Sequence, residues 1–348
     1  MPKLHTHIPQ ETFWCKNDGN IDLAAFLTLR RNIDKFLFPS KLDKEKRLQI
    51  LSLLSKPLID KKNGWKLIKG EECSPLDKEW LQEHFFLSAP LQEVQKGDGI
   101  LIGTGSYAAF FNLQDHIQLR FLGTKNELEN GWKEVSKSDN LLQEASPFAF
   151  SPYFGYLTST PKEAGTGLQI EILLQTPALS LFREEEHLLF NEDDRIEPLH
   201  LFSYSPGIDH GLLLIRNRSS IGLSEDQILS LVKTFADKVV AKETALRKRL
   251  LEKDEAATKD RVSRAFGLLA HSYQIETLEA IEAFGWLKVG LENSWITGVD
   301  RVKLNKLLIN VRRGHLTQQL DVDAPREELL HKRAELLHKE LNGIQLLI

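Results

Sequence analysis

Residues 100–121 read ILIGTGSYAAFFNLQDHIQLRF, and this stretch decides the fold class. Its first part, Ile100 to Leu113, is apolar and aromatic, which is typical of a buried strand. Residues 117–121 then alternate between apolar and polar side chains, which predicts a second strand with one buried face. Because only residues 114–116 separate the two, we expect them to pair antiparallel through a tight turn.

Three more strands are predicted downstream, at Leu168–Gln175, Leu199–Tyr204 and Gly211–Asn217. They lie close together in the sequence without a regular helix between each pair. A doubly wound parallel sheet needs such helices as crossovers, so the spacing favours an antiparallel α+β sheet.

Helical periodicity marks both ends of the chain. Ser224 and Gln227 form a capping-box pattern that opens a long helix. Beyond Asp260 the strand signals stop, which predicts an all-helical C-terminal domain at 256–348 after a first domain at 1–255. The other predicted helices are Lys41–Leu54, Leu76–Phe86, Val262–Ala270, Leu278–Leu291, Leu304–Val311 and Arg326–Leu341.

The composition of the 348 residues is that of an ordinary globular protein, with 41% hydrophobic and 27% charged residues. Forty-five Lys and Arg against 49 Asp and Glu give a net charge of −4, so nucleic acid and membranes are not expected partners. Cys15 and Cys73 cannot form a disulfide framework, and no Cys/His spacing predicts a metal site. With no apolar leader or membrane-length run, we expect a cytoplasmic protein.

Five stretches, in order, resemble motifs of the ATP:guanidino phosphotransferase family (the phosphagen kinases), and within it the bacterial protein-arginine kinases of the McsB group. The strongest, at Phe154–Leu168, reads FGYLTSTPKEAGTGL and is similar to GYLTSCPTNVGTGLR. Asn112–Gln118, NLQDHIQ, is similar to NEEDHLR. The remaining three are Leu27–Asn32 (similar to IRLARN), Asn217–Glu225 (similar to SNQVTLGQSE) and Asp260–Gly267 (similar to DRVYRSYG).

The resemblance implies a guanidino-kinase catalytic domain, with an antiparallel sheet flanked by helices, followed by a helical domain. It also implies phosphoryl transfer from Mg-ATP to a guanidinium. That chemistry needs cationic groups around the triphosphate and a carboxylate that orients and deprotonates a guanidinium whose pKa exceeds about 12. In the family, arginines and the glutamate pair of NEEDH supply these groups.

This chain departs from the family at nearly every such position. The family's phosphate-binding arginines fall on Phe26, Thr28, Gln118, Gln169 and Leu199, and its two glutamates fall on Leu113 and Gln114. The family's cysteine is Thr160 and the asparagine that follows it is Glu163. Because a glutamine amide is neutral across the accessible pH range, Gln114 cannot act as a base.

Several motif residues are retained, and each has a structural explanation. Residues 165–167 can form a turn before a strand, and the pair at 115–116 can cap a hairpin by bonding its own backbone. Arg216 and Arg218 fit the solvent face of an edge strand. The retained motif residues are Asp115, His116, Gly165, Thr166, Gly167 and Asn217.

Two functions from different classes follow. The first is a pseudokinase-like binding or regulatory protein that has lost catalysis, needs no nucleotide cofactor and binds a protein partner. The second is an active protein-arginine kinase in which Arg120, Arg216 or Arg218 reaches the cleft and Glu163 or Glu171 supplies the carboxylate.

Further expectations rest on the family alone. The implied partners are a zinc-binding activator protein and the Clp protease system. The phosphoarginine-reading pattern RDxxRA, aligned on Arg333-Ala334, has Leu329 and Leu330 in place of its leading Arg-Asp. Leucines along Arg326–Leu341 form either a bundle core or a homodimer interface.

Overall fold

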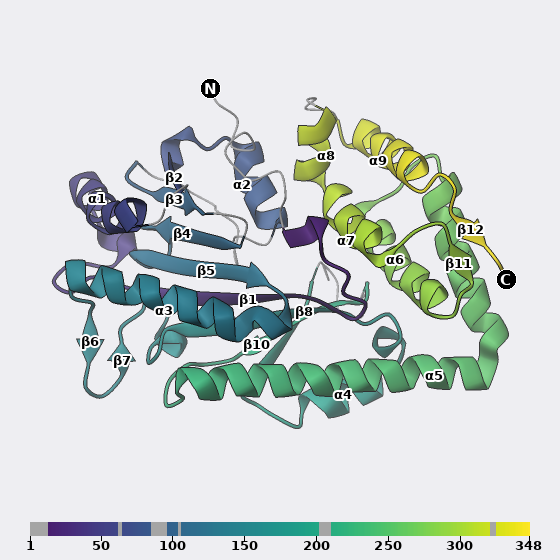
Figure 1. The fold of residues 1–348 in the computed structure, drawn as a ribbon, viewed down its shortest axis with the longest axis horizontal. Helices are drawn as coiled ribbons and strands as arrows, with labels where there is room; N and C mark the ends of the chain where they lie inside the picture. The colour runs from purple at the N-terminus through teal and green to yellow at the C-terminus, as the bar shows by residue number, and fades with distance from the viewer. Residues whose placement is uncertain (1–12, 62–64, 85–95, 104–105, 202–209, 321–324) are drawn as a thin grey trace. The chain divides into compact units, whose positions relative to one another are not determined.

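The chain forms two compact units, each with its own core. The computed structural model describes residues 13–61, 65–84, 96–103, 106–201, 210–320 and 325–348. Unit 1 is built mainly from residues 25–171 and 216–233, and unit 2 from residues 14–24, 172–215 and 234–348. Figure 1 follows the chain from its purple N-terminal segment through the strands to the green and yellow helices. The domain boundary expected at residue 255 remains a prediction.

Strands form one large sheet and two short ribbons. The large sheet has the order β2-β3-β4-β5-β1-β8-β10-β9, while β6 pairs with β7 and β11 with β12. The strands are β1 (Asp22–Arg31), β2 (Lys66–Lys69), β3 (Gly99–Ile102), β4 (Tyr107–Phe111), β5 (Ile117–Gly123), β6 (Phe150–Ser151), β7 (Gly155–Tyr156), β8 (Leu168–Gln175), β9 (Ile196–His200), β10 (Leu212–Asn217), β11 (Ile296–Thr297) and β12 (Gln345–Leu346).

The longer helices divide between the units, with α5 contributing residues to both. They are α1 (Lys44–Lys61), α2 (Pro75–Glu83), α3 (Leu128–Ala145), α4 (Arg183–Phe190), α5 (Glu225–His271), α6 (Thr277–Glu292), α7 (Arg301–Asn310), α8 (Arg313–Leu320) and α9 (Arg326–Glu340). In the described part of the chain, no helix is long and apolar enough to span a membrane.

The pleat of the sheet in unit 1 separates two kinds of face. β1 pairs antiparallel with β5, and β5 with β4, which confirms the predicted hairpin. One face is apolar and is covered by α1 and α3, where Gly131 of α3 lies directly against Phe121 of β5. On the opposite face, Trp80 and Leu81 of α2 pack on Ile100 and Phe110. Polar side chains continue this second face across β5, β1 and β8.

Helix α5 begins as the sequence predicts. Ser224 Oγ accepts the backbone N–H of Gln227 at 3.3 Å, and Gln227 Oε1 accepts the N–H of Ser224 at 2.8 Å, so the capping box is present. Two helices meet within α5 at the non-helical residue Asp254, whose Oδ1 accepts the backbone N–H of Ala257 at 2.9 Å, as the residue at a helix start does. The second of them runs to His271 and contains the helix expected at Val262–Ala270, which is therefore confirmed with an earlier start.

In unit 2, the apolar face of α9 packs against other residues of the same chain. Leu329 packs on Leu316 of α8, and Leu337 is fully buried. The alternative of a bundle core therefore describes this face, because its leucines already have apolar neighbours in the same chain.

Other boundaries differ from the predictions in detail. Ile100–Leu113 is two strands, β3 and β4, that pair with each other, and not a single strand. The strand expected at Leu199–Tyr204 begins at Ile196 and ends at His200, while residues 202–209 lie outside the described part of the chain. The strands predicted at 168–175 and 211–217 are confirmed as β8 and β10. Sequence periodicity missed strands β1 and β2, helices α3, α4 and α8, and the two-residue strands β6, β7, β11 and β12.

Buried His315 of α8 makes the stability of the chain depend on pH. Burial, with a smaller contribution from Arg312, lowers the pKa of His315 to about 3. The unfolded chain takes up this proton near pH 6.5 and the native chain does not. The free energy of unfolding is therefore expected to fall as the pH drops from about 6.5 toward 3, by up to about 1.4 kcal/mol per pH unit.

Urea unfolding of wild type and His315→Gln from neutral to acidic pH measures this contribution. The variant is expected to lose less stability than wild type over the same window. His338→Gln, which changes an exposed histidine of α9, serves as the matched control and should follow wild type. Identical pH profiles for His315→Gln and wild type would contradict the assignment.

Candidate active site on one face of the sheet

The predicted phosphate-binding positions of unit 1 lie on one face of three neighbouring strands. Thr28 of β1 is opposite Arg120 of β5, and Arg30 is opposite Gln118. Since alternate residues of a strand share a face, Phe26 belongs to the same set. Gln169 and Glu171 of β8 complete it, through side-chain contacts with the two arginines. The sheet therefore brings together Phe26, Thr28, Gln118 and Gln169, which the sequence related only by alignment.

Arg30 occupies the middle of this face and is 2% exposed. Its Nη2 donates to Gln169 Oε1 at 2.9 Å. Its Nε lies 3.4 Å from Glu163 Oε2 and 4.0 Å from Asp115 Oδ2. One guanidinium thus lies between positions 118 and 169, where the family pattern has two. Arg30 was not among the predicted site residues, although an arginine stands where the IRLARN pattern has alanine.

Arg120 forms a second buried pair on the same face. Its Nη2 is 3.1 Å from Glu171 Oε2, and its Nη1 donates to Thr28 Oγ1 at 2.5 Å. The guanidinium also lies over the Phe26 ring, 4.9 Å from its centroid. Burial lowers the pKa of Arg120, and the Glu171 carboxylate opposes this shift. Arg216 reaches the same carboxylate, with Nη1 4.0 Å from Glu171 Oε1.

Residues that replace the family's base, cysteine and asparagine contact one another. Gln114 Nε2 donates to Thr160 Oγ1 at 2.5 Å and lies 3.4 Å from Glu163 Oε2. Leu113 instead packs against the apolar cluster under α2. The position of the family's base pair is therefore occupied by an amide and an apolar side chain, with the Glu163 carboxylate beside the amide.

Asp115 and His116 join three separate segments. Asp115 Oδ1 accepts from Asn32 Nδ2 and from the backbone N–H of Ser159, both at 2.7 Å. His116 Nδ1 accepts the N–H of Ile33 at 2.9 Å, so Nε2 carries the proton and donates to the Leu37 carbonyl at 2.8 Å. Burial lowers the pKa of His116, which favours this neutral form. The expectation that the pair caps its own hairpin was wrong, because its partners lie in other segments.

The retained turn at residues 165–167 and the retained Asn217 make contacts with the ends of neighbouring strands. Gly165 and Gly167 both have positive φ, and a Cβ on Gly167 would lie 2.6 Å from the Arg30 carbonyl oxygen. Between them, the Thr166 carbonyl accepts from Arg31 Nη1 at 2.7 Å. Asn217 uses its amide like a strand backbone, accepting the Ile170 N–H at 2.8 Å and donating to the Leu168 carbonyl at 3.1 Å.

Charges on this face balance. Arg30, Arg120 and Arg216 face Asp115, Glu163 and Glu171, within the distances given above. Each arginine therefore has a carboxylate of its own chain.

Leu199, one of the predicted phosphate-binding positions, lies on β9, which belongs to unit 2. The expectation that Arg216 and Arg218 lie on an edge strand was wrong, because β10, which carries Arg216, has β8 and β9 as neighbours, and Arg218 follows the end of that strand.

The C-terminal helices use their arginines differently. Buried Arg333 of α9 donates Nε to the Val311 carbonyl and Nη1 to the Ile275 carbonyl, both at 2.6 Å. The Val311 carbonyl lies at the C-terminal end of α7, and the Ile275 carbonyl lies just before the start of α6, so Arg333 provides both with a hydrogen-bond donor.

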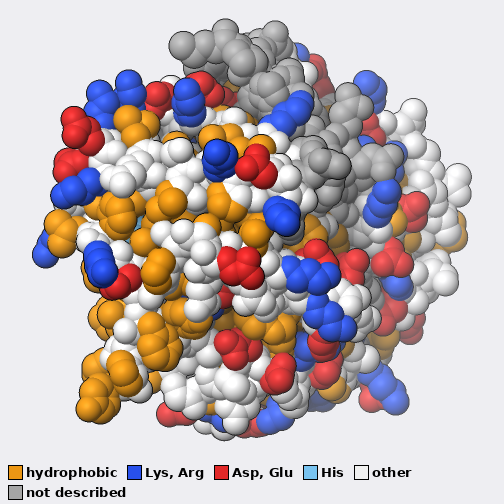
Figure 2. Space-filling view, turned by 60° about the vertical axis from the view of Figure 1, so that its left-hand side comes forward, with side chains coloured by type: hydrophobic (Ala, Val, Ile, Leu, Met, Phe, Trp, Pro, Cys, Tyr) orange, Lys and Arg blue, Asp and Glu red, His pale blue; other side chains and the backbone are white. Residues whose placement is uncertain are grey.

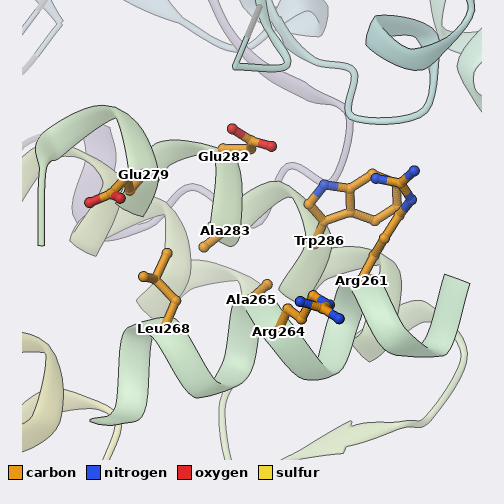
Figure 3. Close-up of a pocket in the computed structure, with 8 residues that line it drawn as sticks. All are labelled: Arg261, Arg264, Ala265, Leu268, Glu279, Glu282, Ala283 and Trp286. Carbon is orange, nitrogen blue, oxygen red and sulfur yellow. The ribbon is translucent and has the colours of Figure 1, made fainter. Parts of the chain in front are cut away.

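Between the last part of α5 and α6 lies a groove of about 310 Å³ (Figure 3), where the Arg261 guanidinium lies 5.6 Å from the Trp286 ring centroid. Arg264 on its rim pairs with Asp260 at 2.7 Å.

Comparison with known families agrees with this geometry. Residues 49–246 match the family described as "ATP:guanido phosphotransferase, C-terminal catalytic domain". Residues 255–346 match "Protein-arginine kinase McsB C-terminal domain". The chain belongs to the ATP:guanido phosphotransferase family. Within that family it belongs with the protein-arginine kinases, as its full-length relatives show.

These relatives span nearly the whole chain. A "Protein-arginine kinase" from Halothermothrix orenii is 30% identical over 340 residues, covering 94% of this chain and 96% of that protein. Another from Chlamydia pneumoniae is 31% identical over 325 residues, covering 91% and 90%.

Solved structures confirm the predicted α+β guanidino-kinase fold. A lombricine kinase superposes with a TM-score of 0.56 at 16% identity, covering 69% of this chain and 74% of that one. The duplicated taurocyamine kinase from Schistosoma mansoni gives 0.58 at 18% identity, covering 76% and 40%. At this identity the likeness concerns the fold alone.

The Arg120–Glu171 pair can be tested by removing one or both partners. Glu171→Leu leaves a buried guanidinium without its carboxylate, and we expect it to lower the free energy of unfolding by about 3–5 kcal/mol. The double variant Arg120→Leu/Glu171→Leu removes both charges and should recover most of this loss. Urea denaturation of the four proteins in the cycle gives the values. A double variant that loses the sum of the two single effects would contradict the pairing.

Proposed function

We propose that this chain is a non-catalytic member of the protein-arginine kinases that acts by binding a protein partner. The observation that carries the proposal is the charge balance on the candidate active-site face. Arg30 and Arg120, which lie among the family's phosphate-binding positions, are held by Gln169, Glu163 and Glu171. Nucleotide binding by these arginines would break contacts that the chain already makes.

The residues on this face do not fit Mg-ATP. A triphosphate brought against Arg30 and Arg120 would also meet the carboxylates of Asp115, Glu163 and Glu171, which repel it. A hydrogen bond to a charged group contributes about 1.5–3 kcal/mol, and a micromolar complex needs about 8 kcal/mol. Replacing several phosphate-binding arginines therefore removes a contribution as large as the whole binding free energy.

The two positions that hold the family's base, which would deprotonate the substrate guanidinium, carry no basic side chain in this chain. Leu113 is apolar and Gln114 is a neutral amide hydrogen-bonded to Thr160. Neither can accept a proton from a guanidinium.

A second candidate function is an active protein-arginine kinase with a rearranged site. The observation that favours it is the place of Glu163, whose carboxylate lies 3.4 Å from Gln114 Nε2, beside the family's base position. Arg120, Arg216 and Glu171 are less suited to such a site, because they are engaged with one another. This candidate requires Arg30 to leave Glu163 when substrate binds.

The partner remains a proposal based on the family. A zinc-binding activator protein or the Clp protease system would fit a binding protein that kept the kinase fold and lost the chemistry. A cytoplasmic location is part of the same proposal.

A labelling assay separates the two candidates. Purified chain is incubated with γ-labelled ATP, Mg²⁺ and an arginine-rich protein, and acid-labile label on arginine is measured. We expect no label above background, whereas the Halothermothrix orenii relative, assayed in parallel as the positive control, should label the substrate. Label that depends on Glu163, and is lost in Glu163→Gln, would support the active kinase and overturn the proposal.

A further inference from the structure

The groove between the last part of α5 and α6 has one basic wall and one acidic wall. Each helix turns two like charges and an alanine toward it, at the same spacing. These residues are Arg261, Arg264 and Ala265 on α5, and Glu279, Glu282 and Ala283 on α6. Residues three and four apart share one face of a helix, so each set forms a single stripe. We call the two arginines the arginine wall and the two glutamates the glutamate wall.

The floor of the groove is apolar. Ala265 and Ala283 are buried, and Figure 3 places both between the helices, in the middle of the groove. Because alanine ends at its Cβ, side chains of a partner can come close to both helix backbones at this point. The Trp286 ring closes one end, beside the Arg261 guanidinium. A volume of about 310 Å³ is near the lower end of the range for small-molecule pockets, so the groove has room for a few side chains.

The two walls do not neutralise each other. Among the residues that the structure describes, no ion pair joins the arginine wall to the glutamate wall. Arg264 pairs within its own helix at 2.7 Å. Glu282 lies 3.2 Å from His210 Nδ1, and Glu279 accepts the backbone N–H of Glu276 at 2.8 Å. All four side chains of the walls are exposed, and a guanidinium or a carboxylate has more hydrogen-bonding positions than these contacts use.

A helix suits this groove better than an extended strand. The backbone N–H and C=O groups within α5 and α6 are bonded inside each helix, so the groove offers no ladder of backbone partners to a strand. A third helix satisfies its own backbone and needs no such ladder. Its side chains would pack between those of the two walls, as ridges of one helix pack into the grooves of another.

The charges also specify what kind of helix fits. Figure 2 shows a different kind of surface, where hydrophobic side chains gather along the left and lower left of that view with few charges among them. Such a surface selects little besides apolar character. The groove instead selects the sign of charge on each side of its occupant, because a like charge against either wall is unfavourable.

We propose that this groove binds an amphipathic helix of a protein partner, with acidic residues against the arginine wall and basic residues against the glutamate wall. The proposal rests on the proposed function, since it names the kind of partner that a non-catalytic chain would bind. The apolar stripe of the partner helix lies over Ala265 and Ala283 and reaches Trp286, as in other helix-in-groove complexes. Only one of the two directions along the groove brings unlike charges together on both sides, so the charges also fix the direction of the helix.

Synthetic helical peptides of about 20 residues, long enough to hold a helix, test the proposal on the full chain. All three have Leu and Ala along one face. The mixed peptide has Glu on one flank and Lys on the other, the second has Glu on both flanks and the third has Lys on both. Fluorescence anisotropy is expected to show the mixed peptide binding about tenfold more tightly than the other two. Equal affinities, or no binding of the mixed peptide at millimolar concentration, would overturn the proposal.

Reversal of the arginine wall tests whether the groove is the site. Arg261→Glu/Arg264→Glu makes both walls acidic, so this variant should bind the Lys-flanked peptide more tightly than the mixed one. Lys248→Glu/Lys253→Glu, at exposed positions of α5 outside the groove, changes the net charge equally and should keep the wild-type order. Far-UV circular dichroism checks the fold of both variants. The wild-type order in the Arg261→Glu/Arg264→Glu variant would place the peptide elsewhere and refute the assignment.

The peptide assay separates this proposal from the proposed function, because it needs no nucleotide. Arginine labelling together with selective peptide binding would contradict the proposed function and support the groove. No labelling and no selective binding would contradict the groove alone. Peptide affinity that weakens as the concentration of the chain is raised would mean that a second copy occupies the groove, which would also overturn the proposal.

Discussion

A buried guanidinium needs a carboxylate, and this constraint shapes the central face of the sheet. Leaving one charge of a buried pair alone costs about 3–5 kcal/mol. The family satisfies its sheet arginines with a ligand that carries phosphates. In this chain Arg30 Nε lies 3.4 Å from Glu163 Oε2, and Arg120 Nη2 lies 3.1 Å from Glu171 Oε2. We propose that these carboxylates take the place of phosphate groups and oppose the binding of a triphosphate.

Much of the fold could be predicted from local signals, and the misses have physical causes. The antiparallel turn at 114–116, strand β8 and the cap at Ser224 depend on residues near in sequence. Ile100–Leu113 was predicted as one strand because it is mostly apolar, although residues 103–106, GTGS, carry the glycines typical of a turn between β3 and β4. Helix α3 was missed because Gly131 and many polar residues interrupt its stripe, although Gly131 is needed where α3 meets Phe121. The helix predicted at Val262–Ala270 begins earlier, just after the non-helical residue Asp254, whose Oδ1 accepts the N–H of Ala257.

The positions of the candidate site could be predicted from the sequence, but the pairing of its side chains could not. Alignment located the replaced positions, and the sheet brings Thr28, Gln118 and Gln169 together as the family pattern requires. The pairs could not be read from the sequence, since Arg30 and Gln169 are 139 residues apart. A signal was nevertheless present. New arginines at 30 and 120 and new carboxylates at 163 and 171 occur beside the lost family residues, which indicates an exchange of charges rather than simple decay.

Nucleotide affinity is the most direct test of this account. Isothermal titration of the purified chain with Mg-ATP and Mg-ADP, with the Halothermothrix orenii protein-arginine kinase as a parallel control, measures whether the arginines of the sheet are available to phosphate. The account predicts no binding heat at millimolar nucleotide, alongside clear binding by the control. Micromolar binding by this chain would contradict it, because the arginines would then have to release Glu163 and Glu171 at little cost.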